Sequence, residues 1–283
     1  MNHFVDISTH TTPQRNKRQV SHQFSRAAAT YDQAAHIQAQ ALEGLLSHLQ
    51  QHQPEGTLQG QWLDIGCGTG KALKPLLDLG AQHITGVDLA EGMLQQARQR
   101  TLSNTQLILA DADALPLPNN SMDGLISSLM LQWSENLTAT FKEWARVLKP
   151  GGTAAIATLL PGTHKELQHA WSQLDDFVHV NPFDSADQLC YSARSAGLHI
   201  SILEQQSLVE KHPDLRTLLR QLKAIGATNV NTGRKPGLTT RKTFHVLEQN
   251  YPRDDQQQLP LTYQTAWLIM TKPVHFTSEP PSL

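Results

Sequence analysis

Apolar positions along the chain follow two different spacings. Between residues 14 and 56 they recur at the spacing of helices, which predicts two N-terminal helices that end before Pro54 and Gly56. Between residues 61 and 159 five short apolar runs alternate with amphipathic stretches; the runs are QWLDIG, HITGVDL, TQLILAD, SMDGLISS and GGTAAIATL. Strands that alternate with helices build a parallel sheet with helices on both faces. The pattern therefore predicts an α/β fold with a doubly wound, mostly parallel sheet.

The spacing changes after residue 159. Residues 160–196 have helical patterns with polar faces and no strand-like run, so we expect a helical cap inserted over the binding edge of the sheet. A strand near 198–208, helices near 212–226 and 239–250, and a final strand LTYQTAWLIM follow. Because the last periodic segment is a strand, we expect it to be an edge partner of the sheet.

These segments predict a single domain with two disordered tails. Residues 1–13 and 275–283 are polar and lack periodicity, as frayed chain ends do. We treat residues 14–272 as one domain. Its expected parts are the N-terminal helices (14–56), a ligand-binding core (61–159), the helical cap (160–196) and C-terminal strands with a basic helix (198–272).

Composition excludes several classes of protein. With 39% hydrophobic and 17% charged residues, the chain of 283 residues is typical of soluble globular proteins. No apolar run approaches the roughly 20 residues of a membrane helix, and the polar N-terminus does not resemble a secretory signal. Two cysteines, Cys67 and Cys190, are too few for a disulfide framework, which indicates a reducing, cytoplasmic location. A net charge of −2 argues against nucleic acid as a partner.

A glycine-rich loop follows the first predicted strand, with Gly66, Gly68 and Gly70 directly after Asp64 and Ile65. Glycines at such a turn allow positive φ and let a ligand approach the backbone. A dinucleotide-binding fingerprint would need a further glycine at position 71, where the chain has Lys71. The carboxylate of Asp64 is better placed for an ammonium group than for a pyrophosphate. This combination indicates the amino-acid end of S-adenosylmethionine.

Two further acids follow the next two predicted strands. Asp88 can accept hydrogen bonds from both hydroxyls of a ribose, and Asp111 is placed for the exocyclic amine of adenine. Leu89 and Met93 supply apolar contacts to the adenine, beside Ala112. Each acid alone could equally be a solvated carboxylate at a strand end. Together with the glycines, they favour a cofactor site.

At this point the sequence resembles class I S-adenosylmethionine-dependent methyltransferases, which have a Rossmann-like fold. The matching motifs lie in order across residues 61–158: LDIGCGTG, GVDLAEGML, DADALPLPNNSMD and RVLKPGG. Within that superfamily the chain resembles the malonyl-[acyl-carrier protein] O-methyltransferases of early biotin synthesis. This resemblance rests on FSRAAATYDQAAHIQ, SSLMLQWSENL, LKAIGATNVNTGR and LPLTYQTAWLIM.

The resemblance implies a substrate, malonyl thioester on acyl carrier protein or on coenzyme A, whose free carboxylate becomes a methyl ester. It places Tyr31 over the cofactor, where its phenol would orient the substrate; otherwise Tyr31 is a helix aromatic packed on the sheet. Gln132 and Trp133 follow the fourth strand and are expected in the substrate pocket wall, or as loop anchors. Phe183 is expected to contact substrate. Family members often carry Asn-Arg-Phe where this chain has Pro182, so no carboxylate-binding arginine carries over.

Positive charge gathers between residues 211 and 242. Eight lysines and arginines stand there against one acid, Asp214, in a chain whose net charge is −2. In a predicted helix the cations and the leucines fall on different faces. Because acyl carrier proteins are acidic as a class, this segment fits a docking surface for one, although a solvated helix face would have the same pattern. The residues expected to dock the carrier are Arg216, Arg220, Lys223, Arg234 and Lys235.

Several alternatives stay open at this level. Another class I methyltransferase, acting on a quinone or a small carboxylic acid, would share the motifs, and so would a non-catalytic protein that only binds S-adenosylmethionine. His48 and His52 lie four residues apart but lack a third ligand, so we expect no metal. We expect the protein to be a monomer that contacts neither a membrane nor a nucleic acid.

Overall fold

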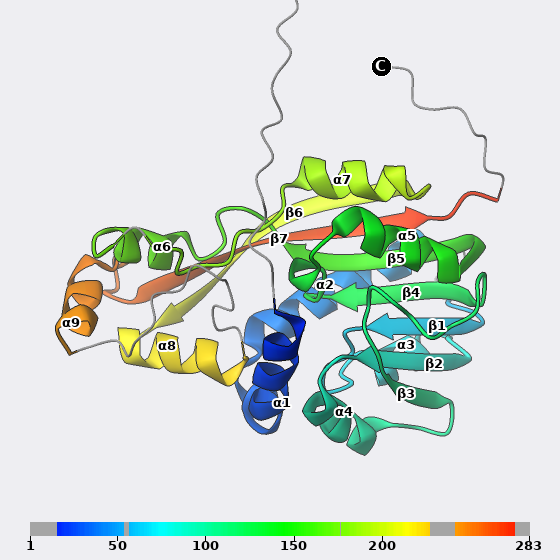
Figure 1. Ribbon diagram of the computed structural model, residues 1–283, viewed down its shortest axis with the longest axis horizontal. Coiled ribbons are helices and arrows are strands. Elements are labelled where there is room, and N and C mark those ends of the chain that lie inside the picture. Colours follow the sequence, from blue (N-terminus) through cyan, green and yellow to red (C-terminus); the bar gives the residue numbers. More distant parts are fainter. Residues whose placement is uncertain (1–15, 54–56, 176, 227–240, 275–283) are drawn as a thin grey trace, which may run out of the picture.

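The computed structural model of the protein describes residues 16–53, 57–175, 177–226 and 241–274. In these ranges seven strands form one sheet in the order β3-β2-β1-β4-β5-β7-β6 (Figure 1). The strands are β1 (Gln61–Ile65), β2 (His83–Asp88), β3 (Thr105–Leu109), β4 (Met122–Ser128), β5 (Leu148–Leu159), β6 (His199–His212) and β7 (Leu259–Thr271). The helices are α1 (Lys17–Ala34), α2 (His36–His52), α3 (Leu73–Asp78), α4 (Glu91–Ala97), α5 (Leu137–Val147), α6 (Lys165–Ser172), α7 (Ala186–Ser195), α8 (Leu215–Ala224) and α9 (Arg241–Asn250).

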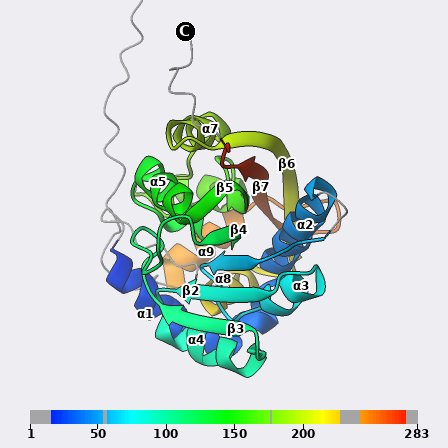
Figure 2. The same ribbon diagram turned by 90° about the vertical axis from the view of Figure 1, so that its right-hand side faces the viewer.

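The first five strands are parallel, and helices cover both faces of the sheet, which confirms the predicted doubly wound α/β fold (Figure 2). Phe141 and Trp144 of α5 are fully buried on one face, in a cluster that also includes Leu189 of α7. Leu45 of α2 and Leu73 of α3 are buried on the other. Burial on both faces explains why these strands are almost continuously apolar in sequence.

The last strand is not at the edge, so the expectation of an edge partner is wrong. β7 pairs antiparallel with β5 on one side and with β6 on the other, and β6 is the edge strand. The burial of the two strands accounts for the order. β7 is buried along most of its length, whereas most side chains of β6 are exposed. A polar strand with one neighbour suits an edge, and an apolar strand suits the interior.

The two longest strands continue past the end of the parallel sheet. β7 pairs with β5 only as far as the Leu159–Thr265 pair, but it pairs with β6 as far as His212 and Leu259. We call the ribbon formed by residues 207–212 and 259–264, together with α6, α8 and α9, the C-terminal extension. It projects from the edge at which the parallel strands end (Figure 1).

Residues 160–196 do not form a single helical cap, so this expectation is also wrong. α7 packs against α5, and its Leu189 and Ala193 belong to the core cluster of the sheet. It is therefore an ordinary sheet-covering helix. Of the two helices in this range, only α6 joins the C-terminal extension, where Leu167 and Ala170 pack in the cluster that contains Leu218 of α8 and Leu247 of α9.

Candidate cofactor and substrate site

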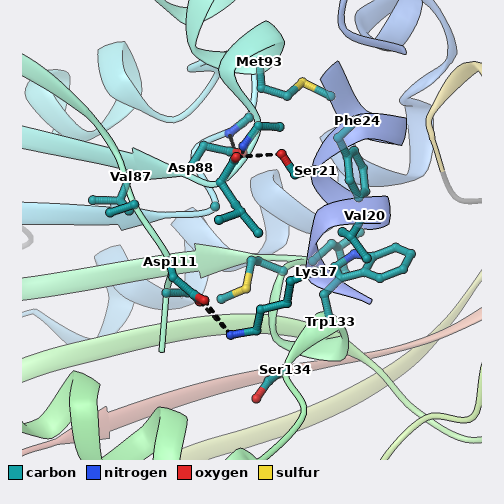
Figure 3. Close-up of a pocket in the computed structure, with 18 of the residues that line it drawn as sticks. Lys17, Val20, Ser21, Phe24, Val87, Asp88, Met93, Asp111, Trp133 and Ser134 are labelled. Atoms are coloured by element: carbon teal, nitrogen blue, oxygen red, sulfur yellow. Dashed lines mark hydrogen bonds and ion pairs between the residues drawn. The ribbon is translucent and has the colours of Figure 1, made fainter. Parts of the chain in front are cut away.

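A pocket lies at the edge where the parallel strands end, between those ends and α1 (Figure 3). Ligands of open parallel sheets bind at this edge. The lining residues include Lys17, Val20, Ser21, Phe24, Tyr31, Gly66, Gly68, Asp88, Leu89, Met93, Asp111, Ala112, Leu129, Met130 and Trp133. Nine of these residues are expected from the sequence, and six are not: Lys17, Val20, Ser21, Phe24, Leu129 and Met130.

The glycine loop has the conformation that its sequence predicts. Gly66, Gly68 and Gly70 have φ of +71°, +52° and +80°, a region that favours glycine. A Cβ on Gly66 would lie 2.5 Å from the side chain of Met130, whereas one on Gly68 would meet nothing within 4 Å. Gly70 does not line the pocket; a Cβ there would meet Leu73 and Ala97 at 3.0 and 3.1 Å. Gly66 and Gly68 therefore leave the pocket open, and Gly70 allows close packing behind it.

The carboxylate of Asp88 is oriented by backbone amides. The N–H of Gly68 donates to its Oδ2 at 2.8 Å, and the N–H of Ala90 donates to its Oδ1 at 2.8 Å. Burial raises the pKa of Asp88 above its usual value, against the effect of these hydrogen bonds. Each oxygen keeps acceptor capacity on the side of the pocket that the carboxylate lines. Asp88 is thus a rigid acceptor of the kind that a pair of ribose hydroxyls requires.

Asp64 lies behind the loop and is 3% exposed. Its Oδ2 is buried and has no hydrogen-bond partner among the described residues. Burial, followed by the charge of Asp88, raises the pKa of Asp64 to about 7. An unpaired carboxylate at this depth is costly unless a cation or a donor satisfies it. The orphaned oxygen therefore fits the ammonium group that the sequence analysis assigned to it.

The opposite end of the pocket is closed by an ion pair from α1. The ammonium of Lys17 lies 2.7 Å from Asp111 Oδ2 and 2.6 Å from Asp113 Oδ2 (Figure 3). The N–H of Asp113 also donates to Asp111 Oδ1 at 3.0 Å. Lys17 thus holds the carboxylate that was predicted to accept the adenine amine. The predicted adenine amine would therefore meet an acceptor that Lys17 already occupies.

Helix α1 is one wall of the pocket, although it precedes the first strand by many residues. Val20, Ser21 and Phe24 face Val87 and Asp88 across the cavity (Figure 3). Arguments from strand ends cannot find such residues. The sequence indicates that this helix lies at the site only through the motif FSRAAATYDQAAHIQ, which carries the family resemblance and places Tyr31 over the cofactor; Val20 and Ser21 precede that motif.

The end of α1 is fastened to the glycine loop through Asp32. Thr69 Oγ1 donates to Asp32 Oδ1 at 2.7 Å, and Arg100 Nη2 lies 2.6 Å from Asp32 Oδ2. Partial burial opposes ionisation, but the hydrogen bond from Thr69 and the charges of Lys71 and Arg100 hold the pKa of Asp32 below its usual value. Tyr31 is the neighbouring residue, so this attachment also fixes where its phenol lies.

Only some of the residues predicted to contact substrate line the pocket. Tyr31 and Trp133 line the pocket, and Phe24 packs between them, edge-on to Trp133 at 5.4 Å between ring centroids. Gln132 does not line it; its Nε2 donates to the carbonyl of Leu129 at 2.6 Å, as a loop anchor does. Phe183 packs in the cluster of the C-terminal extension, to which Tyr31 also contributes.

The predicted basic helix is present. Leu215, Leu218 and Leu222 of α8 are buried, and the opposite face is exposed. That exposed face carries Arg216, Arg220 and Lys223. Arg234 and Lys235 lie outside the described residues.

Two negative findings apply to the described part of the chain. It contains no group of three or more His, Cys, Asp or Glu residues that could hold a metal ion. None of its helices has the length and apolar character needed to cross a bilayer.

Comparison with known proteins agrees with this geometry. Residues 63–156 match the Methyltransf_11 family, described as a methyltransferase domain. The chain is 41% identical to the malonyl-[acyl-carrier protein] O-methyltransferase of Serratia marcescens, over 90% of this chain and 96% of the relative. The chain belongs to the malonyl-[acyl-carrier protein] O-methyltransferase family. It is accordingly a class I methyltransferase, and its cofactor is S-adenosylmethionine.

Other relatives of this methyltransferase family are longer. The biotin biosynthesis bifunctional protein BioHC of Cellvibrio japonicus is 38% identical over 91% of this chain, but the match covers only 51% of BioHC. The chain thus spans about half the length of the bifunctional relatives that it matches. Among solved structures, the [4+2]-cyclase SpnF has a TM-score of 0.60 and 19% identity, covering 93% of this chain and 99% of SpnF. That likeness shows the fold alone.

Proposed function

We propose that the protein methylates the free carboxylate of a malonyl thioester carried by acyl carrier protein or coenzyme A, as an early step of biotin synthesis. The observation that carries this proposal is the 41% identity, over nearly its whole length, to a relative named for that reaction. The pocket at the ends of the parallel strands, with Tyr31 and Trp133 in its wall, is consistent with it. We further propose that the enzyme acts in the cytoplasm as a monomer.

Bound S-adenosylmethionine supplies an electrophilic methyl group. On this proposal Asp64 and the backbone at Gly66 and Gly68 hold its amino-acid end, and Asp88 accepts from its ribose. Asp111 accepts from the adenine amine, beside Leu89, Met93 and Ala112. Because Lys17 is bonded to both Asp111 and Asp113, it can stay on Asp113 when the adenine takes its place on Asp111.

The acceptor needs little chemical activation. A malonyl carboxylate ionises near pH 4, like side-chain carboxyls, so it is already a nucleophile at neutral pH and no general base is required. Catalysis then rests on orientation and on the exclusion of water, which can lower a barrier by up to about 7–11 kcal/mol.

Tyr31 is the proposed orienting residue. Burial, followed by the charge of Asp88, raises the pKa of the Tyr31 phenol well above its usual value, so the hydroxyl stays protonated. A neutral donor can hold a carboxylate oxygen without the loss of nucleophilicity that a tight ion pair would cause. Trp133 and Phe24 form the apolar wall beside it. Phe183 is proposed to act further along the acyl path, and Gln132 is proposed to support the wall through its hydrogen bond to the carbonyl of Leu129.

We propose that the exposed face of α8 docks the acidic carrier through Arg216, Arg220 and Lys223, with Arg234 and Lys235 as further members. Within the described residues none of the first three forms an ion pair, and Arg216 lies 6.0 Å from the ring centroid of Phe244. Charge complementarity of this kind accelerates association and selects the partner.

The direct test is to incubate the purified protein with S-adenosylmethionine and malonyl-carrier, and to look by mass spectrometry for the gain of one methyl ester. Transfer confined to a quinone or to another small acid would contradict the proposed substrate but leave the enzyme class intact. Binding of S-adenosylmethionine without transfer to any of these acceptors would favour a non-catalytic binding protein.

Reversing α8 charges tests the docking proposal. The variant Arg216→Glu/Arg220→Glu/Lys223→Glu is expected to raise KM for malonyl-carrier by about tenfold or more while sparing malonyl-pantetheine, because only the carrier protein meets this face. Steady-state kinetics with both substrates measure the difference. Equal losses on the two substrates would contradict docking at α8.

A further inference from the structure

A second row of basic side chains lies on the outer face of α1. Arg18, His22 and Arg26 are spaced four residues apart and are all exposed. Val20 and Phe24, which line the pocket, point from the other side of the same helix. One face of α1 is therefore a wall of the cofactor site, and the opposite face is a basic stripe open to solvent.

Arg18 and Arg26 lack acidic partners among the described residues, as do ten of the other 18 described lysines and arginines. The ion-paired cations are Lys17, Lys71, Lys74, Arg98, Arg100, Arg146, Lys149 and Lys211. Arg18 and Arg26 form no ion pair with any described carboxylate, as is also true of Arg220 and Lys223. Their charge is available to a partner without first breaking an intramolecular pair.

Helices α1 and α8 are in contact with each other (Figure 1). Thr30 Oγ1 donates to the carbonyl of Ala224 at 3.5 Å, and a Cβ on Gly226 would lie 3.2 Å from the ring of Phe24. Arg26 is one helical turn before Thr30, and Lys223 immediately precedes Ala224. The two rows of cations thus come together at this junction.

We propose that Arg18, His22 and Arg26 of α1 form the second half of the carrier-docking surface, so that the acidic carrier protein spans α1 and α8. This inference rests on the proposed function, because it assumes a carrier-bound substrate. Net charge supports the choice of partner: the chain as a whole is slightly negative, so a local positive stripe suits one acidic protein better than a polyanion.

Docking on α1 also gives the substrate a short route to the methyl group. An α-helix with its side chains is only about 10 Å across, and the cofactor pocket lies on the inner face of this one. A carrier seated on the outer face therefore starts its flexible arm within one helix width of the site. Docking at α8 alone would leave the arm to run the length of that helix.

The test is the double variant Arg18→Glu/Arg26→Glu, with Lys142→Glu/Arg194→Glu as the matched control. The control changes net charge equally, and its residues are exposed on α5 and α7, two helices that pack against each other. We expect KM for malonyl-carrier to rise about tenfold in the α1 variant, with less than a twofold change for malonyl-pantetheine, and the control to match the wild type on both substrates. The effect should shrink as salt is raised, because exposed charges are screened.

Several outcomes would overturn the proposal. An unchanged KM for malonyl-carrier, an equal rise in the control, or an equal loss with malonyl-pantetheine would each remove α1 from the docking surface. Calorimetric titration with S-adenosylmethionine and a thermal melt check that the pocket and fold are intact; if the Glu variant melts early, Arg18→Gln/Arg26→Gln must still raise the carrier KM. A wild-type protein that cannot methylate malonyl-carrier would instead defeat the proposed function itself, and that result is visible before any variant is made.

Discussion

A carboxylate of the parallel half of the sheet and one of the C-terminal extension use their hydrogen-bonding capacity in opposite ways. In the parallel half, Asp88 is buried and lines the open cavity, and the buried carboxylate of Asp64 keeps an oxygen without a described partner. In the extension, the buried carboxylate of Glu166 accepts from the N–H and the hydroxyl of Thr262 at 3.0 and 2.5 Å. Asp64 keeps unmet hydrogen-bonding capacity for a ligand, and Glu166 has used its own to hold the ribbon together.

The difference extends to the surface. Cofactor recognition rests on backbone amides and strand ends, whose positions the sheet fixes. The proposed carrier recognition rests on long, flexible cations on helix faces, where a partner brings the opposite charge. Changes in the parallel half should therefore alter affinity for the cofactor, and changes in the extension should alter stability or carrier use.

The largest expected effect is at Asp88. Asp88→Ala removes a charged acceptor from the ribose position, and affinity for S-adenosylmethionine should fall at least about 100-fold, since each hydrogen bond to a charged group contributes about 1.5–3 kcal/mol. Isothermal titration calorimetry measures the change. Asp78→Ala, at an exposed position on α3, is the control and should bind normally. Undiminished binding by the Asp88 variant would mean that the pocket is misassigned.

Replacing Asp64 should raise the stability of the ligand-free protein and lower its affinity for the cofactor. Its pKa is about 7 in the folded protein and about 4 in an unfolded chain, so the folded state holds the proton more tightly and stability falls as pH rises between these values. Asp64→Asn avoids that fall. We expect its Tm without ligand to exceed the wild-type value by a few degrees at pH 8 and to match it near pH 4, while affinity for S-adenosylmethionine drops about tenfold. A Tm difference that is independent of pH would contradict the buried-charge account.

A substitution at Glu166 tests the role of buried hydrogen bonds in the C-terminal extension. Glu166→Gln offers one acceptor oxygen to two donors of Thr262, which leaves one buried group unsatisfied. The free energy of unfolding should fall by about 1–3 kcal/mol, with unchanged affinity for S-adenosylmethionine. Urea unfolding and calorimetry measure the two quantities, and Glu43→Gln, exposed on α2, is the control. A loss of cofactor affinity without a loss of stability would contradict the structural role assigned to Glu166.

The smallest expected effect is at Tyr31, where the two regions meet. Tyr31→Phe keeps the ring and loses the hydroxyl, so kcat with a malonyl thioester should fall about threefold to tenfold, while affinity for S-adenosylmethionine stays the same. Single-turnover kinetics separate this step from product release. If kcat is unchanged, Tyr31 is a packing residue, the alternative that its helix position also allowed.

The sequence predicted the parallel half well because its signals are local. Gly66 and Gly68 need positive φ, Asp88 ends a strand, and strand ends of a parallel sheet meet at one edge, so a site could be placed without knowing the fold in detail. The pocket wall from Val20 to Phe24 could not be found this way, since nothing local shows where a helix that precedes the sheet will pack.

The extension was harder to predict for a related reason. The position of β7 in the sheet depends on whether β7 or β6 is the more apolar strand. That comparison involves two segments that are distant in the sequence. The apolar run of β7 against the polar pattern of β6 contains the answer, but only once both are known to join one sheet. The packing of α7 on α5, where a cap was expected, also depends on a contact between segments that are distant in the sequence.

The interior position of β7 also sets the order in which the molecule can be completed during synthesis. β6 pairs with no described strand except β7, and Trp267 of β7 donates a hydrogen bond to the carbonyl of Ala41 in α2. β6 and α2 are synthesised before β7, and they therefore cannot complete these contacts until β7 has been made. Until residues 259–271 emerge from the ribosome, the edge of β5 stays unpaired and apolar, which is the period in which a nascent chain is most prone to associate with its neighbours.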